Sequence, residues 1–144
     1  MQRFEYAVKL SADQEAGFVV TCRDLPELIT QGEDRSHALN EAADAMDELF
    51  ATYMKKGLFF PKPSPLKRGE HWVCPPAETL AKAALYVAMS ESGISKVELA
   101  KRLGVDEKEV RRLLDPHYAS KLPRIAQAID ALERKLVIGL QVSI

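Results

Sequence analysis

Large apolar and polar residues alternate along short segments in the first half of the chain. Between residues 3 and 10 every second position carries a large apolar side chain, and this spacing predicts a half-buried strand. Three further segments rich in β-branched or aromatic residues predict strands at 18–22, 28–30 and 71–74. Turn residues separate the first three strands, so we expect an antiparallel sheet whose third strand lies at an edge or next to one.

A helical period replaces this alternation after the third strand. From Ala38 to Tyr53, apolar residues recur at helical spacing, with carboxylates on the opposite side. N-cap candidates lie at 33–36, and Gly57 follows two lysines as a helix stop. Three strands, one helix and one further strand predict a small α+β domain over residues 1–74.

Beyond a proline pair at residues 75–76 the hydrophobic pattern becomes helical. Helical spacing occurs in three segments: 77–92, 95–114 and 123–134. The final segment, 136–144, is apolar and β-branched, which predicts a short strand or a segment packed between two chains. We therefore expect an all-α second domain over residues 75–144 that ends in an oligomerisation tail.

The segment 95–114 predicts two short helices that fold back on each other. Four apolar residues lie on the sides by which the two helices face each other: Leu99, Leu103, Val110 and Leu113. Gly104 can adopt the positive φ that ends the first helix, and Asp106 is a good N-cap for the second. Cations remain on the outer side of the second helix. The pattern favours a helix-turn-helix that places a recognition helix in the major groove of DNA, although an ordinary helical hairpin also fits it.

Six charged residues of this second domain are candidate DNA contacts: Lys96, Glu107, Lys108, Arg111, Arg112 and Lys121. Arg111 and Arg112 are ~100° apart on a helix, so we expect one to reach a base and the other a phosphate. Lys96 and Lys121 would clamp the DNA backbone. Glu107 would accept a hydrogen bond from cytosine or interact with the helix dipole.

The two halves of the chain differ in charge. The first 76 residues carry nine Lys or Arg and twelve Asp or Glu, a balance of −3, whereas the remainder carries eleven and nine, a balance of +2. This asymmetry suits an acidic domain that meets a basic partner, joined to a domain that meets nucleic acid. No segment resembles a membrane span or a cationic leader, so we expect a cytoplasmic protein.

The sequence offers little for catalysis or metal binding. Cys22 and Cys74 lack a metal or redox spacing, and we expect two small buried thiols. The three histidines are scattered without partners at ligand spacing: His37, His71 and His117. Asp13 and Asp24 could converge as a nuclease pair, but neither neighbouring strand carries an aspartate at its centre. We expect a binding protein that is not an enzyme and that holds no metal or cofactor.

Six short motifs in a fixed order give the chain a resemblance to a known family. They lie at Tyr6–Val8, Gly17–Val20, Asp24–Glu27, Thr30–Gly32, Ala38–Ala42 and Pro61–Pro65. Together with the second domain they resemble the HicB antitoxin family in its helix-turn-helix version. The resemblance implies that the first domain has a partial RNase H-like fold and neutralises HicA, a small basic toxin that cleaves messenger RNA. It also implies a dimer or tetramer that represses its own toxin–antitoxin operon.

An acidic surface that covers the active site of such a toxin would compete with its polyanionic substrate. The candidate toxin contacts are therefore acidic: Asp24, Glu27, Glu41, Asp44, Asp47 and Glu48. Two other functions remain open at this point. A transcription regulator that senses a small ligand would have an apolar pocket in its first domain, and a nuclease would lose metal-dependent activity when Asp13 or Asp24 is changed.

Overall fold

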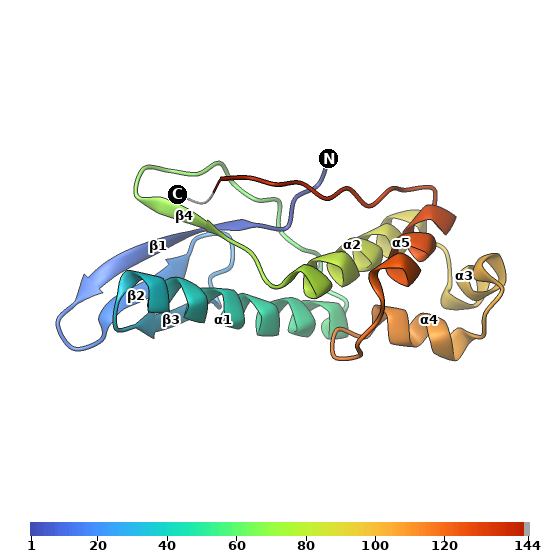
Figure 1. Ribbon diagram of the computed structural model, residues 1–144, viewed down its shortest axis with the longest axis horizontal. Helices are drawn as coiled ribbons and strands as arrows, with labels where there is room; N and C mark the ends of the chain where they lie inside the picture. Colours follow the sequence, from blue (N-terminus) through green and yellow to red (C-terminus); the bar gives the residue numbers. More distant parts are fainter. Residues whose placement is uncertain (143–144) are drawn as a thin grey trace. The chain divides into compact units, whose positions relative to one another are not determined.

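The computed structural model describes residues 1–142, and Ser143 and Ile144 lie outside the described residues. The chain divides into two compact units, Met1–Pro76 and Ala77–Ile144 (Figure 1). Each unit has a hydrophobic core of its own. An α+β architecture is confirmed: the strands lie in the first unit, and the regular elements among the described residues of the second unit are helices.

The first unit contains a four-stranded antiparallel sheet. Its strands are β1 (Tyr6–Asp13), β2 (Gly17–Cys22), β3 (Ile29–Gly32) and β4 (Glu70–Val73), in the order β3-β2-β1-β4. β3 lies at an edge, as predicted. β1 begins and ends later than the alternation predicted, because its bounds follow the residues that pair with β2 and β4, and alternation alone does not reveal these partners.

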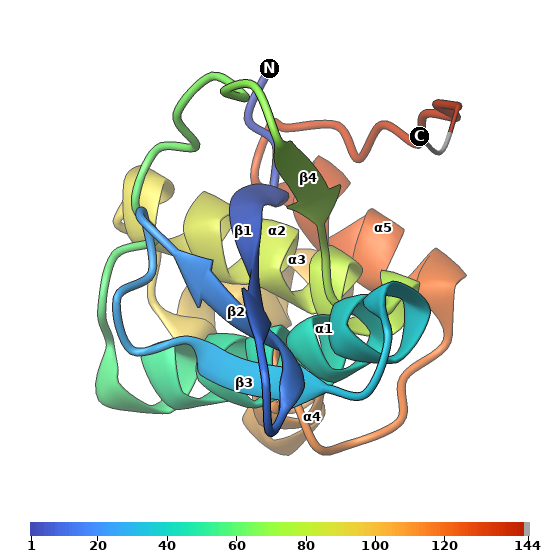
Figure 2. The same ribbon diagram turned by 90° about the vertical axis from the view of Figure 1, so that its left-hand side faces the viewer.

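One long helix, α1 (Arg35–Lys56), packs against one face of this sheet (Figure 2). Asp34 is its N-cap, and the side-chain oxygen of Asp34 accepts a hydrogen bond from the His37 N–H at 2.8 Å. Gly57 ends the helix in the left-handed conformation at φ 70°. The largest buried side chains between helix and sheet include Tyr6, Val8, Val20, Met46 and Phe50.

The start of α1 approaches the sheet so closely that one position of β3 must be glycine. A Cβ atom on Gly32 would overlap the backbone of Ala38. Gly32 also pairs with Phe18 on β2, so the same residue touches both the sheet and the helix. The sequence motif that ends in Gly32 is therefore explained by packing.

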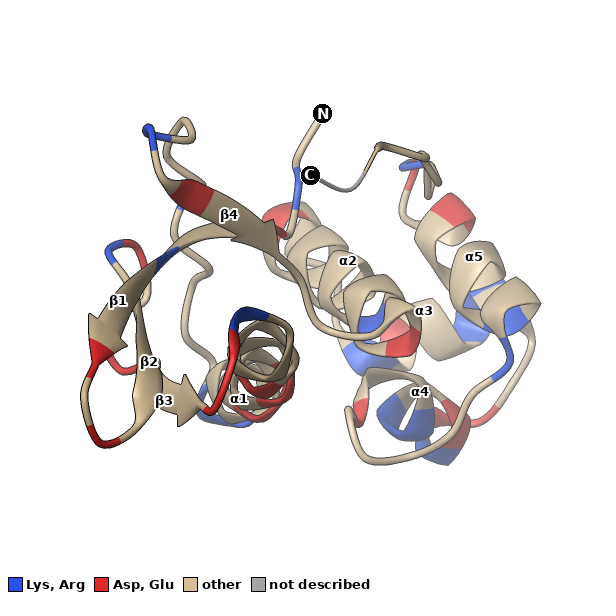
Figure 3. Ribbon diagram, turned by 60° about the vertical axis from the view of Figure 1, so that its left-hand side comes forward, with Lys and Arg blue, Asp and Glu red and all other residues tan. Residues whose placement is uncertain are grey.

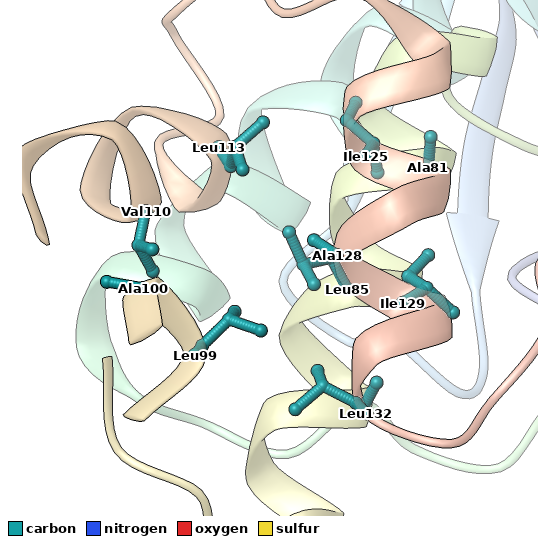
Figure 4. Packing of buried hydrophobic residues seen from close by; sticks show 11 residues of the cluster. Ala81, Leu85, Leu99, Ala100, Val110, Leu113, Ile125, Ala128, Ile129 and Leu132 are labelled. Atoms are coloured by element: carbon teal, nitrogen blue, oxygen red, sulfur yellow. The ribbon is translucent and has the colours of Figure 1, made fainter. Parts of the chain in front are cut away.

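The described part of the second unit, residues 77–142, contains four helices around one apolar cluster. They are α2 (Ala77–Ser92), α3 (Lys96–Leu103), α4 (Glu107–Leu114) and α5 (Leu122–Ala131). Residues from all four helices, together with the residue after α5, meet in this cluster: Ala81, Leu85, Ala88, Leu99, Ala100, Val110, Leu113, Ile125, Ala128, Ile129 and Leu132 (Figure 4). α5 ends three residues earlier than predicted, because Glu133 adopts a positive φ of 62° and leaves the helical conformation.

The prediction of a short C-terminal strand is wrong for the residues that the structure describes. Residues 133–142 form neither a strand nor a helix. A strand needs a neighbour that pairs with its backbone, and the second unit offers only helices among its described residues. Leu136 packs on the helical cluster, whereas Val137, Ile138, Leu140 and Val142 are exposed.

The prediction of two buried thiols holds for Cys22 but is wrong for Cys74, which is exposed. Cys74 follows the buried Val73 at the end of β4, and successive residues of an extended chain point to opposite sides. Within the described residues, no helix has both the length and the apolar character that crossing a membrane requires.

Candidate nucleic-acid and protein interfaces

Three local interactions define the ends of α3 and α4 and the turn between them. The Ser95 hydroxyl accepts from the Glu98 N–H at 3.1 Å and caps α3. Gly104 ends α3 with φ 67°, and the Val105 N–H donates to the Ala100 carbonyl at 3.0 Å. Asp106 then caps α4 by accepting from the Glu109 N–H at 2.9 Å. Gly104 and Asp106 therefore act as the helix stop and the N-cap that the sequence predicts, whereas the cap at Ser95 is added by the structure.

α4 has one apolar side and one cationic side. Val110 and Leu113 are buried in the cluster of the second unit. Helical geometry places Lys108, Arg111 and Arg112 around the opposite side. The Arg111 and Arg112 side chains are 61% and 40% exposed. Blue Lys or Arg positions mark the ribbon of α4 in Figure 3. The residues that we predicted as DNA contacts on α4 therefore share one accessible face.

Two of the three cations already have partners within the second unit. Arg111 forms an ion pair with Glu107 at 2.8 Å, one helical turn away. The Arg112 guanidinium lies 5.3 Å from the centre of the Tyr118 ring and 3.9 Å from a Glu109 oxygen. Lys108 is exposed and makes no ion pair or hydrogen bond with the residues that the structure describes. Glu107 is therefore placed as the partner of Arg111.

The two predicted backbone clamps lie at the ends of other helices. Lys96 is the first residue of α3, Lys121 is the N-cap residue of α5, and both are exposed. Sequence reasoning missed Arg124 on α5, whose exposed guanidinium contacts Glu109 of α4 at 3.4 Å. Only the fold of the second unit brings Arg124 to Glu109, so spacing along the chain gives no signal for it.

In the first unit, three predicted acidic residues lie on the side of α1 that faces away from the sheet. Helical geometry groups Glu41, Asp44 and Glu48 opposite the buried residues of the helix. Glu41 lies 3.3 Å from the His37 ring, and both side chains are exposed. Asp47 is half-buried beside this group. Acidic positions mark this helix in Figure 3.

The two remaining acidic candidates are engaged inside the first unit. Asp24 accepts from the Ser64 N–H at 2.8 Å and from the Ser64 hydroxyl at 2.7 Å. Glu27 accepts from the Tyr53 hydroxyl at 2.6 Å, and burial together with this bond raises the pKa of Tyr53 to about 12. These two carboxylates hold the fold, whereas the acidic residues of α1 point away from it.

The proline-rich segment after α1 forms no strand, but polar side chains fasten it. The Tyr6 hydroxyl donates to the Pro61 carbonyl at 2.6 Å, and Arg23 donates to the Pro65 carbonyl. Arg23 also makes two hydrogen bonds of 2.9 Å to Glu70. These bonds hold the pKa of Glu70 at about 2, below its ordinary value. The motif at Pro61–Pro65 is thus a structural segment: its prolines have no N–H to donate, and two of its carbonyls accept from side chains of the first unit.

The carboxylates considered for a nuclease have structural partners as well. Asp13 accepts from the backbone N–H groups of Glu15 and Ala16 at 2.9 and 3.0 Å and so closes the turn between β1 and β2. Asp24 is occupied by Ser64. Over residues 1–142, no three His, Cys, Asp or Glu side chains are grouped so that they could hold a metal ion.

Comparison with known proteins decides the family. The family described as a HicB-like antitoxin of bacterial toxin–antitoxin systems matches residues 5–84. The chain belongs to the HicB antitoxin family. The match covers the sheet, α1, the proline-rich segment and the first part of α2 of this family member, so the resemblance that rested on six short motifs is confirmed.

Curated relatives extend this likeness over nearly the whole chain. This HicB-family chain is 35% identical over 131 residues to Antitoxin HicB of Escherichia coli strain K12, which covers 91% of the chain and 95% of the relative. It is 34% identical over 140 residues to Antitoxin HicB of Pseudomonas fluorescens, with 96% and 94% covered. It is 30% identical over 141 residues to Antitoxin HicB 1 of Photorhabdus laumondii, with 98% and 90% covered. All three names describe antitoxins.

Proposed function

We propose that this HicB-family protein neutralises a HicA-type mRNA-cleaving toxin through its first unit and represses its own operon through its second. The observation that carries the proposal is the division of charge between two helices. α1 presents carboxylates away from its sheet, and α4 presents cations away from its apolar cluster. One chain thus offers one surface for a basic protein and another for a polyanion.

The second unit acts as a helix-turn-helix in this proposal, with α4 as the recognition helix in the major groove. Its support is the capped pair of short helices with a glycine turn and the cationic outer side of α4. Lys108, Arg111 and Arg112 are the proposed contacts, with Glu107 orienting Arg111. Lys96 and Lys121 contact phosphates on either side.

The first unit covers the toxin in this proposal. The favoured contacts are Glu41, Asp44 and Glu48, with Asp47 beside them. Asp24 and Glu27 would have to give up hydrogen bonds that hold the fold, so they contribute less to binding. The partial RNase H-like relationship of this unit is supported by its order of three strands, a helix and a fourth strand.

The exposed apolar residues of the tail support a homo-oligomer, a dimer or a tetramer. Burying Val137, Ile138, Leu140 and Val142 between copies would remove apolar surface from water. Two copies of α4 would then meet half-sites one helical turn of DNA, or a multiple of it, apart. We place this activity in the cytoplasm, where both messenger RNA and the operator are accessible.

Two sets of substitutions test the two halves of the proposal. The first is Lys108→Ala with Arg111→Ala and Arg112→Ala, and the second is Glu41→Gln with Asp44→Asn and Glu48→Gln. Gel shifts use a duplex from the promoter upstream of this gene, and co-purification uses the product of the adjacent open reading frame. The first set should abolish the shift and keep co-purification, and the second should do the reverse.

Each set serves as the control for the other, because both leave the apolar cores intact. The assignment of the two surfaces is overturned if either set weakens both activities equally, or if the wild-type protein shifts no promoter duplex and retains no adjacent gene product.

A further inference from the structure

A lysine is buried in the second unit. Lys82 lies on α2 and is only 2% exposed, although its spacing gives no sign of a special role. Its ammonium group donates to the carbonyls of Arg112 and Asp115 at 3.0 and 2.6 Å. It also donates to the Tyr118 carbonyl and to the Ser120 hydroxyl, the latter at 3.0 Å. Four oxygens from one short stretch of chain therefore surround this single cation.

The placement of these oxygens explains why the cation is tolerated. The last carbonyls of a helix have no partner within the helix, and they carry the negative end of its dipole. Arg112 and Asp115 lie at the C-terminal end of α4, so the ammonium group of Lys82 fills this position from inside the unit. Burial lowers the pKa of Lys82, while the nearby Asp115 carboxylate acts in the opposite direction.

The loop that follows α4 depends on the same cation. Besides the Lys82 bonds, the Tyr118 N–H donates to the Asp115 carbonyl at 3.1 Å. The Tyr118 ring lies with its centre 5.8 Å from the Lys82 ammonium and 5.3 Å from the Arg112 guanidinium. Lys82 thus fixes the backbone of Tyr118, and the Tyr118 ring in turn makes a cation–π contact with the Arg112 guanidinium.

We infer that Lys82 is a positioning residue for DNA binding: it fixes the end of α4 and Tyr118 so that Arg112 meets DNA in one orientation. The inference rests on the proposed DNA-binding function of the second unit. Lys82 itself is buried and does not touch DNA. Its contribution is to remove conformational freedom that Arg112 would otherwise lose on binding.

The experiment uses the full chain and the promoter duplex described above. Lys82→Met keeps a side chain of similar length but removes the donor. We expect binding about tenfold weaker, with the slope of log K against log salt smaller by about one, as for the loss of one phosphate contact. Lys135→Met, an exposed lysine of the same unit, is the matched control and should bind as the wild type does.

A double-mutant cycle separates positioning from simple stability. If Lys82 acts through Arg112, then Arg112→Ala costs about tenfold in the wild type but less than about threefold in Lys82→Met. Full additivity of the two losses overturns the inference, and so does a Lys82→Met protein that binds within about twofold of the wild type. Failure of the wild type to bind the duplex would instead overturn the proposed function.

If Lys82→Met does not fold, as judged by its helical circular dichroism, Ser120→Ala decides the question. This change removes the hydroxyl by which Ser120 holds Lys82, so it loosens the loop that carries Tyr118 while the lysine keeps its three carbonyl acceptors. Binding about threefold weaker, with the melting temperature within a few degrees of the wild type, supports the positioning role. Unchanged binding overturns it.

Discussion

Two irregular segments, one in each unit, are held in different ways. The proline-rich segment of the first unit is fastened by several side chains, among them Tyr6, Arg23 and Asp24. In the loop after α4 of the second unit, two carbonyls and one hydroxyl converge on a single side chain, that of Lys82. Neither segment has a strand or helix to satisfy its carbonyls, so polar side chains do so. Where several side chains hold a segment, one substitution should lower the stability of the fold only in part. Where one buried cation holds it, a single substitution should have a larger effect.

The largest effect should follow from removing the single cation. We expect Lys82→Met to lower the free energy of unfolding of the second unit by about 3 kcal/mol, because three part-buried carbonyls and the Ser120 hydroxyl lose the ammonium donor that they share. Urea unfolding followed by circular dichroism measures this change, with Lys135→Met as the matched control. A loss below about 1 kcal/mol would contradict the idea that fastening is concentrated on one residue.

A smaller effect is expected where fastening is shared. Asp24→Ala removes both acceptors of Ser64 but leaves Tyr6 and Arg23 in place, so we expect a loss of about 2 kcal/mol. Trp72, the only tryptophan of the chain, lies on β4 and reports unfolding of the first unit by fluorescence. Asp44→Ala, on the outer side of α1, should change stability by less than about 0.5 kcal/mol. Equal losses of stability in Asp24→Ala and Asp44→Ala would show that Asp24 stabilises the fold no more than an exposed carboxylate of α1 does.

The Arg23–Glu70 pair predicts a change that depends on pH. Because the folded pKa of Glu70 is about 2, below the ordinary value of 4.5, the pair stabilises the folded state above about pH 4.5. This stabilisation is lost as the pH falls from about 4.5 to about 2. Glu70→Gln should therefore lower the free energy of unfolding at pH 7 by about 1 kcal/mol. The difference in this free energy between the variant and the wild type should become smaller as the pH falls. Chemical unfolding at a series of pH values measures the gap.

Arg23→Gln provides a second route to the same result, since either change removes the pair. Arg23 also donates to the Pro65 carbonyl, so this variant should lose slightly more stability at neutral pH. A gap to the wild type that stays constant between pH 7 and pH 2 in both variants would show that the pair does not fasten the segment.

The smallest effect on stability is expected for an exposed lysine whose side chain holds no other part of the fold. Lys96 is exposed at the start of α3 and has no side-chain partner among residues 1–142. Lys96→Ala should leave stability unchanged and reduce the salt slope of promoter binding by about one. A gel-shift salt titration measures this slope, with Lys55→Ala at the end of α1 as the control. An unchanged slope would remove Lys96 from the proposed interface.

Local patterns predicted much of the fold and part of the candidate sites. Asp34, Asp106 and Gly104 act as the helix caps that their neighbours in sequence indicated. The outer side of α4 also follows from spacing, since Val110 and Leu113 define the opposite side. These features depend on residues within a few positions of each other, where the geometry of a helix leaves few alternatives.

Other roles could not be predicted, because they depend on residues far apart along the chain. Asp24 and Ser64 are forty residues apart, and a carboxylate that fastens a loop has the same local pattern as one that faces a partner. The composition of the C-terminal tail predicts a strand or a segment packed between two chains, but strand formation depends on a neighbour that the second unit does not supply among its described residues.

The sequence by itself determined the family, the order of strands and helices, and the cationic side of α4, because all of these are local or ordered along the chain. Only the tertiary structure decided which charges hold the fold. It paired Asp24 with Ser64 and Glu27 with Tyr53, placed Arg124 beside Glu109, and buried Lys82 beneath the end of α4. The physical reason is that a buried polar group must find its partners in space, and those partners lie wherever the fold brings the chain together.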